Sequence, residues 1–140
     1  MSPEGIAAMA VKPTFAVLLP TTAYILRLHP PPAREMIAGG VPIALGSDFN
    51  PNAHCISMPF VMNLACVLMK MTLKEAFVAA TLNAAASLNK SQDYGSLEKG
   101  KFGDLVVLRA PCWEHIVYQL VDPPILHVVK KGRIVFSSSH

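Results

Sequence analysis

The sequence predicts an α/β fold with a buried parallel sheet, followed by a small β unit. Residues 14–19 and 41–45 are short apolar runs without alternation of polar and apolar residues, which is typical of parallel strands buried on both faces. A helix-forming segment, residues 33–38, lies between the two runs, so we expect one right-handed β-α-β unit. From Gly95 onward glycines and charges become frequent, and residues 105–108, 126–129 and 133–136 are predicted strands, the last two joined by a tight turn at 130–132.

The N-terminal elements carry recognisable start and stop signals. Ser2 and Pro3 begin a predicted helix over residues 3–11, which ends before Pro13. Residues 21–24 are expected to form a loop, and Gly39 follows the helix 33–38 as a stop signal.

Two longer helices are expected between residues 57 and 84. Ser57 and Pro59 begin the first helix, and the capping-box pattern of Thr72 and Glu75 begins the second. We expect the second helix to bury Leu73, Ala76, Phe77, Ala80 and Ala84. The neighbouring methionines, which we interpret as core-filling side chains, are Met58, Met62, Met69 and Met71.

Composition excludes several classes of function. Of the 140 residues 52% are hydrophobic and 15% are charged, so much surface is meant to be buried. The net charge is +3 with scattered basic residues, which argues against nucleic-acid binding. Three distant cysteines argue against a disulfide framework and for a reducing, cytoplasmic location. We expect no signal peptide, and polar residues interrupt the apolar segment 49–69, so we expect no membrane span.

Asp48 is the strongest candidate for a catalytic residue. It follows the apolar run 41–45, and Asn50-Pro51-Asn52 then forms a turn-rich loop. Ligands of α/β folds bind at the carboxyl ends of parallel strands, where such a side chain is presented. The alternative is that Asp48 only caps a turn.

A strand-end carboxylate can be a metal ligand, a general base or both. Catalytic metal sites need three or four protein ligands and an open position for water. His54 is a weak second candidate, and a solvated loop histidine is the simpler interpretation. The chain has no closely spaced histidine pair, nucleophile elbow or phosphate-binding glycine loop, so the residues alone define half an active site.

Three motifs together resemble the C-terminal part of the amidohydrolase superfamily. They are Gly46-Ser47-Asp48 after a buried strand, Thr81-Leu82-Asn83-Ala84-Ala85 at the end of a helix pair, and a Gly-Ser-Leu-Glu-x-Gly-Lys-x-x-Asp-Leu pattern over residues 95–105. Within that superfamily, residues 18–27, 41–52 and 113–119 are similar to the imidazolonepropionase family. The similarity covers nearly the whole chain.

The resemblance implies a fold, a reaction and a site. Residues 1–94 would be the last βα units of a TIM-like (β/α)8 barrel, and residues 95–140 would be strands of a small β-sandwich. The family hydrolyses 4-imidazolone-5-propanoate to N-formimidoyl-L-glutamate with one zinc or iron ion. Asp48 matches the aspartate that binds this metal and moves a proton from water to the ring nitrogen. Asn50, Asn52 and Ala53 match substrate-contact positions.

The resemblance also implies what this chain lacks. Positions 52 and 53 are glycine and Ser or Thr in many bacterial members, so a side-chain hydroxyl contact at Ala53 is lost. The family's metal-binding histidines would lie upstream, so we expect the chain alone to be inactive and poorly soluble. Homodimerisation or association with a full-length enzyme is a possible partnership. Two alternatives stay open: a non-catalytic binding module formed by truncation, and an amidohydrolase for another cyclic amide.

Overall fold

The computed structural model describes residues 1–139. In chain order its elements are α1 (Pro3–Ala10), β1 (Ala16–Leu18), α2 (Pro20–Ile25), α3 (Ala33–Ala38), β2 (Ile43–Leu45), α4 (Met58–Met69), α5 (Leu73–Ala80), α6 (Leu82–Ser87), β3 (Leu105–Leu108), α7 (His115–Tyr118), β4 (Ile125–Lys130) and β5 (Arg133–Ser137). No helix among these is both long enough and apolar enough to cross a membrane.

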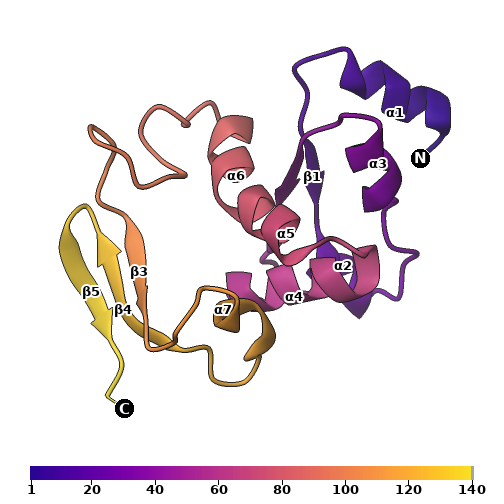
Figure 1. Cartoon of the computed structure of the whole chain (residues 1–140). Coiled ribbons are helices and arrows are strands. Elements are labelled where there is room, and N and C mark those ends of the chain that lie inside the picture. Colours follow the sequence, from indigo (N-terminus) through magenta and orange to yellow (C-terminus); the bar gives the residue numbers. More distant parts are fainter. Residues whose placement is uncertain (140) are drawn as a thin grey trace.

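The strands form two separate sheets. β1 and β2 pair in parallel, with Ala16 opposite Ile43 and Leu18 opposite Leu45. β3, β4 and β5 form an antiparallel sheet in that order. Figure 1 shows the two sheets at opposite sides of the molecule, with α4, α5 and α6 between them. The predicted α/β class and the parallel pairing of the two apolar runs are therefore confirmed.

The main core lies between the β1–β2 sheet and its helices. All three residues of β2 are buried, and Val61 and Ala65 of α4 are fully buried. The methionines that were predicted to fill the core do so, with Met62, Met69 and Met71 buried and Met58 packed against the cluster. β1 differs from its prediction, because Val17 is 52% exposed. Successive side chains of a strand point to opposite faces, and only Ala16 and Leu18 of β1 join the core.

The prediction of a loop at residues 21–24 is wrong, because this segment is part of helix α2. Pro20 occupies the start of the helix, where its missing N–H costs no helical hydrogen bond. Burial of Thr21 and Ala23 fixes the turn against the rest of the chain. The low helix propensity of two adjacent threonines is thus overridden by packing.

The predicted long helix after Thr72 is divided into α5 and α6. The capping box of Thr72 and Glu75 is confirmed at its start. The break falls at Thr81, whose hydroxyl donates to the carbonyl of Phe77 at 2.7 Å. A threonine that bonds back to the preceding turn bends a helix.

The predicted burial of this helix is correct for Ala76 and wrong for Leu73 and Phe77, which are each 37% exposed. Ala80 and Ala84 are only partly buried. The ring of Phe77 lies 4.6 Å from the ring of Trp113 instead, centroid to centroid. This contact ties α5 to the segment before α7, a short helix that the sequence pattern did not predict.

The C-terminal hairpin agrees with its prediction. Lys131 and Gly132 form the turn with φ values of 50° and 74°, and both residues of a type I′ turn require positive φ. The Asp104 carboxylate accepts hydrogen bonds from the Lys130 ammonium group and from the Lys131 N–H. β3 is thereby tied to the hairpin by side-chain contacts as well as by its ladder.

Candidate active site at the end of strand β2

Asp48 lies at the carboxyl end of the parallel β1–β2 sheet. The N–H of Gly46 donates to the carbonyl of Leu18 at 3.0 Å and prolongs the pairing just beyond β2. The backbone then turns sharply, because Asp48 has a φ of 49°. Aspartate is one of the few residues other than glycine that adopt this left-handed conformation. The Asp48 side chain is partly exposed at the sheet edge.

Two hydroxyl groups from the start of α2 contact this strand end. The Thr21 hydroxyl donates to the carbonyl of Ser47 at 2.8 Å. The Thr22 hydroxyl donates to Oδ2 of Asp48 at 2.5 Å. β1 leads directly into α2, so the parallel pairing of β1 with β2 brings both threonines beside Asp48. Within residues 1–139, no hydrogen bond reaches the second carboxylate oxygen, Oδ1.

The loop after Asp48 is organised by the side chain of Asn50. Its amide nitrogen donates to the carbonyl of Asp48 at 2.5 Å, and its amide oxygen accepts from the N–H groups of Asn52 and Ala53 at 2.9 and 3.2 Å. Ala53 is 2% exposed, and its backbone also pairs with that of Asn50. Asn52 is exposed. The structure thus brings the predicted residues Asp48, Asn50, Asn52 and Ala53 into one turn.

The opposite end of β2 is supported by α6. The side-chain amide of Asn83 donates to the carbonyl of Ile43 at 2.8 Å. Beside it, Arg34 of α3 forms an ion pair with Glu75 of α5. Partial burial acts to raise the pKa of Glu75, but hydrogen bonds from Thr72 and Arg34 and the Arg34 charge outweigh it and lower the pKa. β2 is therefore fixed along its length before it presents Asp48.

The histidines do not complete a site around Asp48. His54 is exposed, and its ring packs edge-on against Phe49 with centroids 4.9 Å apart. His115 bonds to Tyr118 of α7 and to Gln119 just after that helix, and His127 bonds to Ser137 on the antiparallel sheet. Across residues 1–139 there is no group of three or more His, Cys, Asp or Glu side chains that could hold a metal ion. Around Asp48 the described residues offer one carboxylate as a donor, which does not by itself hold a metal.

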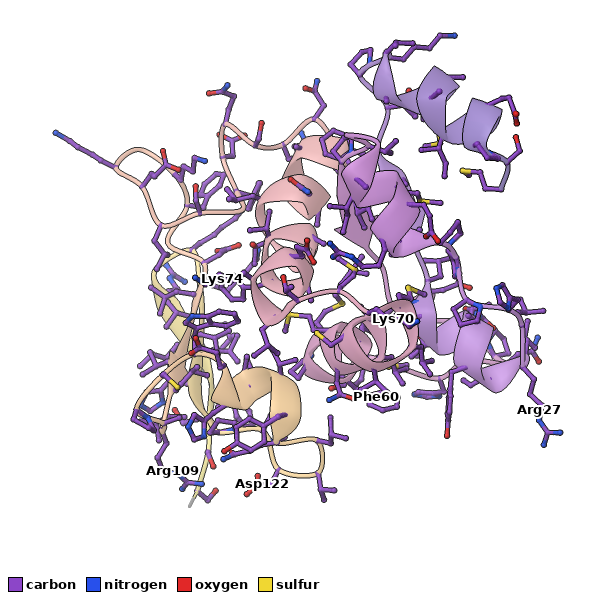
Figure 2. The ribbon with its side chains drawn as sticks, turned by 45° about the vertical axis from the view of Figure 1, so that its right-hand side comes forward. Arg27, Phe60, Lys70, Lys74, Arg109 and Asp122 are labelled. Atoms are coloured by element: carbon purple, nitrogen blue, oxygen red, sulfur yellow. The ribbon has the colours of Figure 1, made fainter. Side chains whose placement is uncertain are left out.

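Three of the basic side chains lie far apart in the structure. Figure 2 shows Arg27 and Arg109 at opposite sides of the molecule, with Lys70 between them. Arg27 follows α2, Lys70 joins α4 to α5, and Arg109 follows β3.

Thr21 and Thr22 were missed as site residues. Their contacts span 26 positions of sequence, so no local spacing reveals them. The available signal was the position of both hydroxyls directly after the first apolar run. The carboxyl ends of adjacent parallel strands meet at one edge, which places residues after β1 beside residues after β2.

Comparison with known proteins identifies the family of this chain. The model of the amidohydrolase family matches residues 3–135. The chain therefore belongs to the amidohydrolase family. A probable imidazolonepropionase of Dictyostelium discoideum is 71% identical over 140 residues, which are 100% of this chain and 33% of that protein. A probable imidazolonepropionase of Nematostella vectensis is 59% identical over 139 residues, covering 98% of this chain and 32% of that protein.

Solved structures share the fold at low sequence identity. Guanine deaminase of E. coli aligns with a TM-score of 0.83 and 19% identity, covering 99% of this chain and 37% of the enzyme. An adenosine deaminase of Xanthomonas campestris with bound zinc aligns with a TM-score of 0.82 and 23% identity, covering 96% of this chain and 34% of that enzyme. Compared with the two imidazolonepropionase relatives named above, the chain spans about a third of their length.

Proposed function

We propose that this chain forms the C-terminal third of an imidazolonepropionase and supplies the catalytic carboxylate of its site. The observation that carries the proposal is the 71% identity to the Dictyostelium protein across all 140 residues. In this proposal residues 1–94 are the last βα units of a TIM-like barrel, and residues 95–140 are strands of a composite β-sandwich. The free cysteines support a cytoplasmic location.

The proposed reaction hydrolyses 4-imidazolone-5-propanoate to N-formimidoyl-L-glutamate. The oxygen of water bonds to the ring carbonyl carbon, the ring C–N bond breaks, and the departing nitrogen gains a proton. Asp48 accepts the proton of the attacking water on Oδ1 and passes it to that nitrogen. Its position at a rigid strand end, with Oδ2 already bonded to Thr22, supports this role.

The turn after Asp48 supplies the proposed substrate contacts. Asn50 retains one N–H of its amide beyond the bond to the Asp48 carbonyl, and Asn52 is exposed. Ala53 has a buried side chain, and its N–H and carbonyl are bonded inside the turn. A contact at position 53 therefore requires the turn to open when substrate binds.

We further propose that one zinc or iron ion completes the site, with Asp48 as one ligand. Such an ion lowers the pKa of bound water toward ~7 and so supplies hydroxide at neutral pH. Catalytic sites of this kind use three protein ligands and an open position. The remaining ligands come from a polypeptide region outside residues 1–139, because these residues offer no such group.

A second candidate function is that of a non-catalytic binding module. The exposed apolar side chains of β5 favour it: Ile134, Val135 and Phe136 are 61%, 62% and 52% exposed. In this case the chain would associate with the full-length enzyme or with a second copy. Co-purification of a tagged chain with the full-length Dictyostelium relative would support this function, and a free monomer would count against it.

The proposed function is tested by extending the chain. The extended protein carries the part of the Dictyostelium relative outside the match, joined ahead of residue 1. Metal content and hydrolysis of 4-imidazolone-5-propanoate are measured for the extended protein and for the 140-residue chain. We expect metal and turnover in the extended protein alone. Turnover by the short chain would show that its own histidines complete the site, and no turnover in either would reject the reaction.

A further inference from the structure

We propose that Thr22 is a positioning residue, whose hydroxyl holds one oxygen of the Asp48 carboxylate so that the other stays free to act. This inference rests on the proposed function for the role of Asp48. The relevant contact is the 2.5 Å hydrogen bond from Oγ1 of Thr22 to Oδ2 of Asp48. This length is typical of a hydroxyl that donates to an ionised carboxylate, and such bonds are about twice as strong as neutral ones.

The hydrogen bonds around Asp48 divide into two kinds. The Thr21 hydroxyl and the Asn50 amide bond to backbone carbonyls, of Ser47 and of Asp48 respectively. They fix the path of the chain, including the left-handed backbone of Asp48. Among the described residues only Thr22 bonds to the carboxylate itself. Without that bond, the carboxylate of a partly exposed residue at a strand end can rotate about its side-chain bonds.

The Thr22 hydroxyl is itself held firmly. It belongs to the first turn of α2, in which the preceding side chains of Pro20 and Thr21 are fully buried. Thr22 is only partly buried, so its own side chain is not part of the core. The position therefore combines a rigid backbone with a hydroxyl aimed at the reactive group, which is the arrangement that positioning requires.

Loss of this bond should affect the chemical step more than substrate binding. A carboxylate that spends less time in the productive orientation lowers kcat, while contacts of the substrate with the loop persist. The methyl group of threonine takes no part in this hydrogen bond. Thr22→Ser should therefore behave like the original protein, and Thr22→Val, which replaces the hydroxyl by a methyl group, should not.

The test measures hydrolysis of 4-imidazolone-5-propanoate by the extended protein and its variants. We expect Thr22→Val to lower kcat by about 10- to 100-fold with KM changed by less than about threefold. Thr22→Ser should keep kcat within about threefold of the original protein. Thr81→Val is the matched control, because the Thr81 hydroxyl also donates a hydrogen bond, to the carbonyl of Phe77, but lies at the α5–α6 break and away from Asp48 in its bonding. An unchanged kcat in Thr22→Val, or an equal loss in Thr22→Ser, would overturn the proposal.

A second readout does not depend on turnover. Crystal structures of the extended protein and its Thr22→Val variant report the orientation of the Asp48 carboxylate. We expect one orientation in the original protein and in Thr22→Ser, and a rotated or divided one in Thr22→Val. An Asp48 carboxylate that stays in place in Thr22→Val would overturn the proposal whatever the kinetics. If the original extended protein shows no turnover, the proposed function fails, and the carboxylate orientation alone decides the role of Thr22.

Discussion

The two sheets of this protein differ in how far the chain covers them. Ile43, Ala44 and Leu45 of β2 are 3%, 1% and 5% exposed, whereas every residue of β5 is exposed. β2 is held by helix side chains and by the hydrogen bond from Asn83 to Ile43, and the segment just after it is held by the bond from Thr21 to Ser47. The antiparallel sheet is held by its own ladder, by the contacts of Asp104 with the hairpin, and by Leu108 and Ile125, which pack against the main core at one end. The candidate catalytic carboxylate thus lies on the sheet that this chain makes rigid.

Replacing one isoleucine of each sheet by alanine should give the largest difference in stability between the two sheets. Ile43→Ala removes a side chain from the packed core, and we expect a loss of about 2–5 kcal/mol in the free energy of unfolding. Ile134→Ala removes an exposed side chain and should cost less than about 1 kcal/mol. Urea unfolding of both variants measures the difference. Equal losses would show that β5 is covered in solution by a partner or a second copy.

Two glycines provide the next comparison. Gly95 has a φ of 94°, and an added Cβ would lie 2.8 Å from the Cβ of Ala85 and 3.0 Å from the carbonyl oxygen of Thr81. Gly95→Ala should therefore cost about 2–4 kcal/mol through backbone strain and a steric clash. Gly132 has a φ of 74° with open space around it, so Gly132→Ala should cost about 1–2 kcal/mol from strain alone. Thermal unfolding of the two variants checks this order, and a more stable Gly95→Ala would contradict the packing of this segment on α6.

Removing one hydroxyl group from each region should give a smaller difference in stability. Thr21→Val leaves the partly buried carbonyl of Ser47 without its donor, which should cost about 1–3 kcal/mol in the free energy of unfolding. Ser137→Ala removes an exposed hydrogen bond to His127 and should change stability by less than about 0.5 kcal/mol. Denaturant midpoints of the two variants measure these losses of stability. An unchanged stability of Thr21→Val would mean that water replaces the hydroxyl as the donor to Ser47.

Acidic pH should lower the stability of the fold by a small amount through one carboxylate in each region. The hydrogen bond from Lys130 is the main cause that lowers the pKa of Asp104 below its ordinary value of 3.8, and the pKa of Glu75 is lowered below 4.5. A carboxylate with a lowered folded-state pKa stabilises the fold above its unfolded pKa, and this contribution disappears as the pH falls through the folded pKa. The melting temperature should therefore fall below pH 4.5. Asp104→Asn should reduce this dependence, and an unchanged pH profile would contradict the Lys130 contact.

Local patterns predicted the parts of the structure that depend on neighbours in sequence. The apolar run of β2, the capping box of Thr72 and the Lys131-Gly132 turn each depend on a few adjacent residues. Helix α2 and the hydroxyl contacts of Thr21 and Thr22 depend on segments 26 residues apart, and no local pattern encodes them. Asp48 was recognisable as a strand-end carboxylate. The partner that orients it became visible only when β1 and β2 were paired.

Asp48 is the proposed catalytic carboxylate, and one substitution in the extended protein tests this role most directly. Asp48→Asn keeps the size of the side chain and removes its negative charge, whereas Asp122→Asn makes the same change at an exposed position before the Pro123-Pro124 segment. We expect Asp48→Asn to lower turnover of 4-imidazolone-5-propanoate by about 10²- to 10⁴-fold and to reduce bound metal, while Asp122→Asn changes neither. Full turnover and metal content in Asp48→Asn would contradict the account.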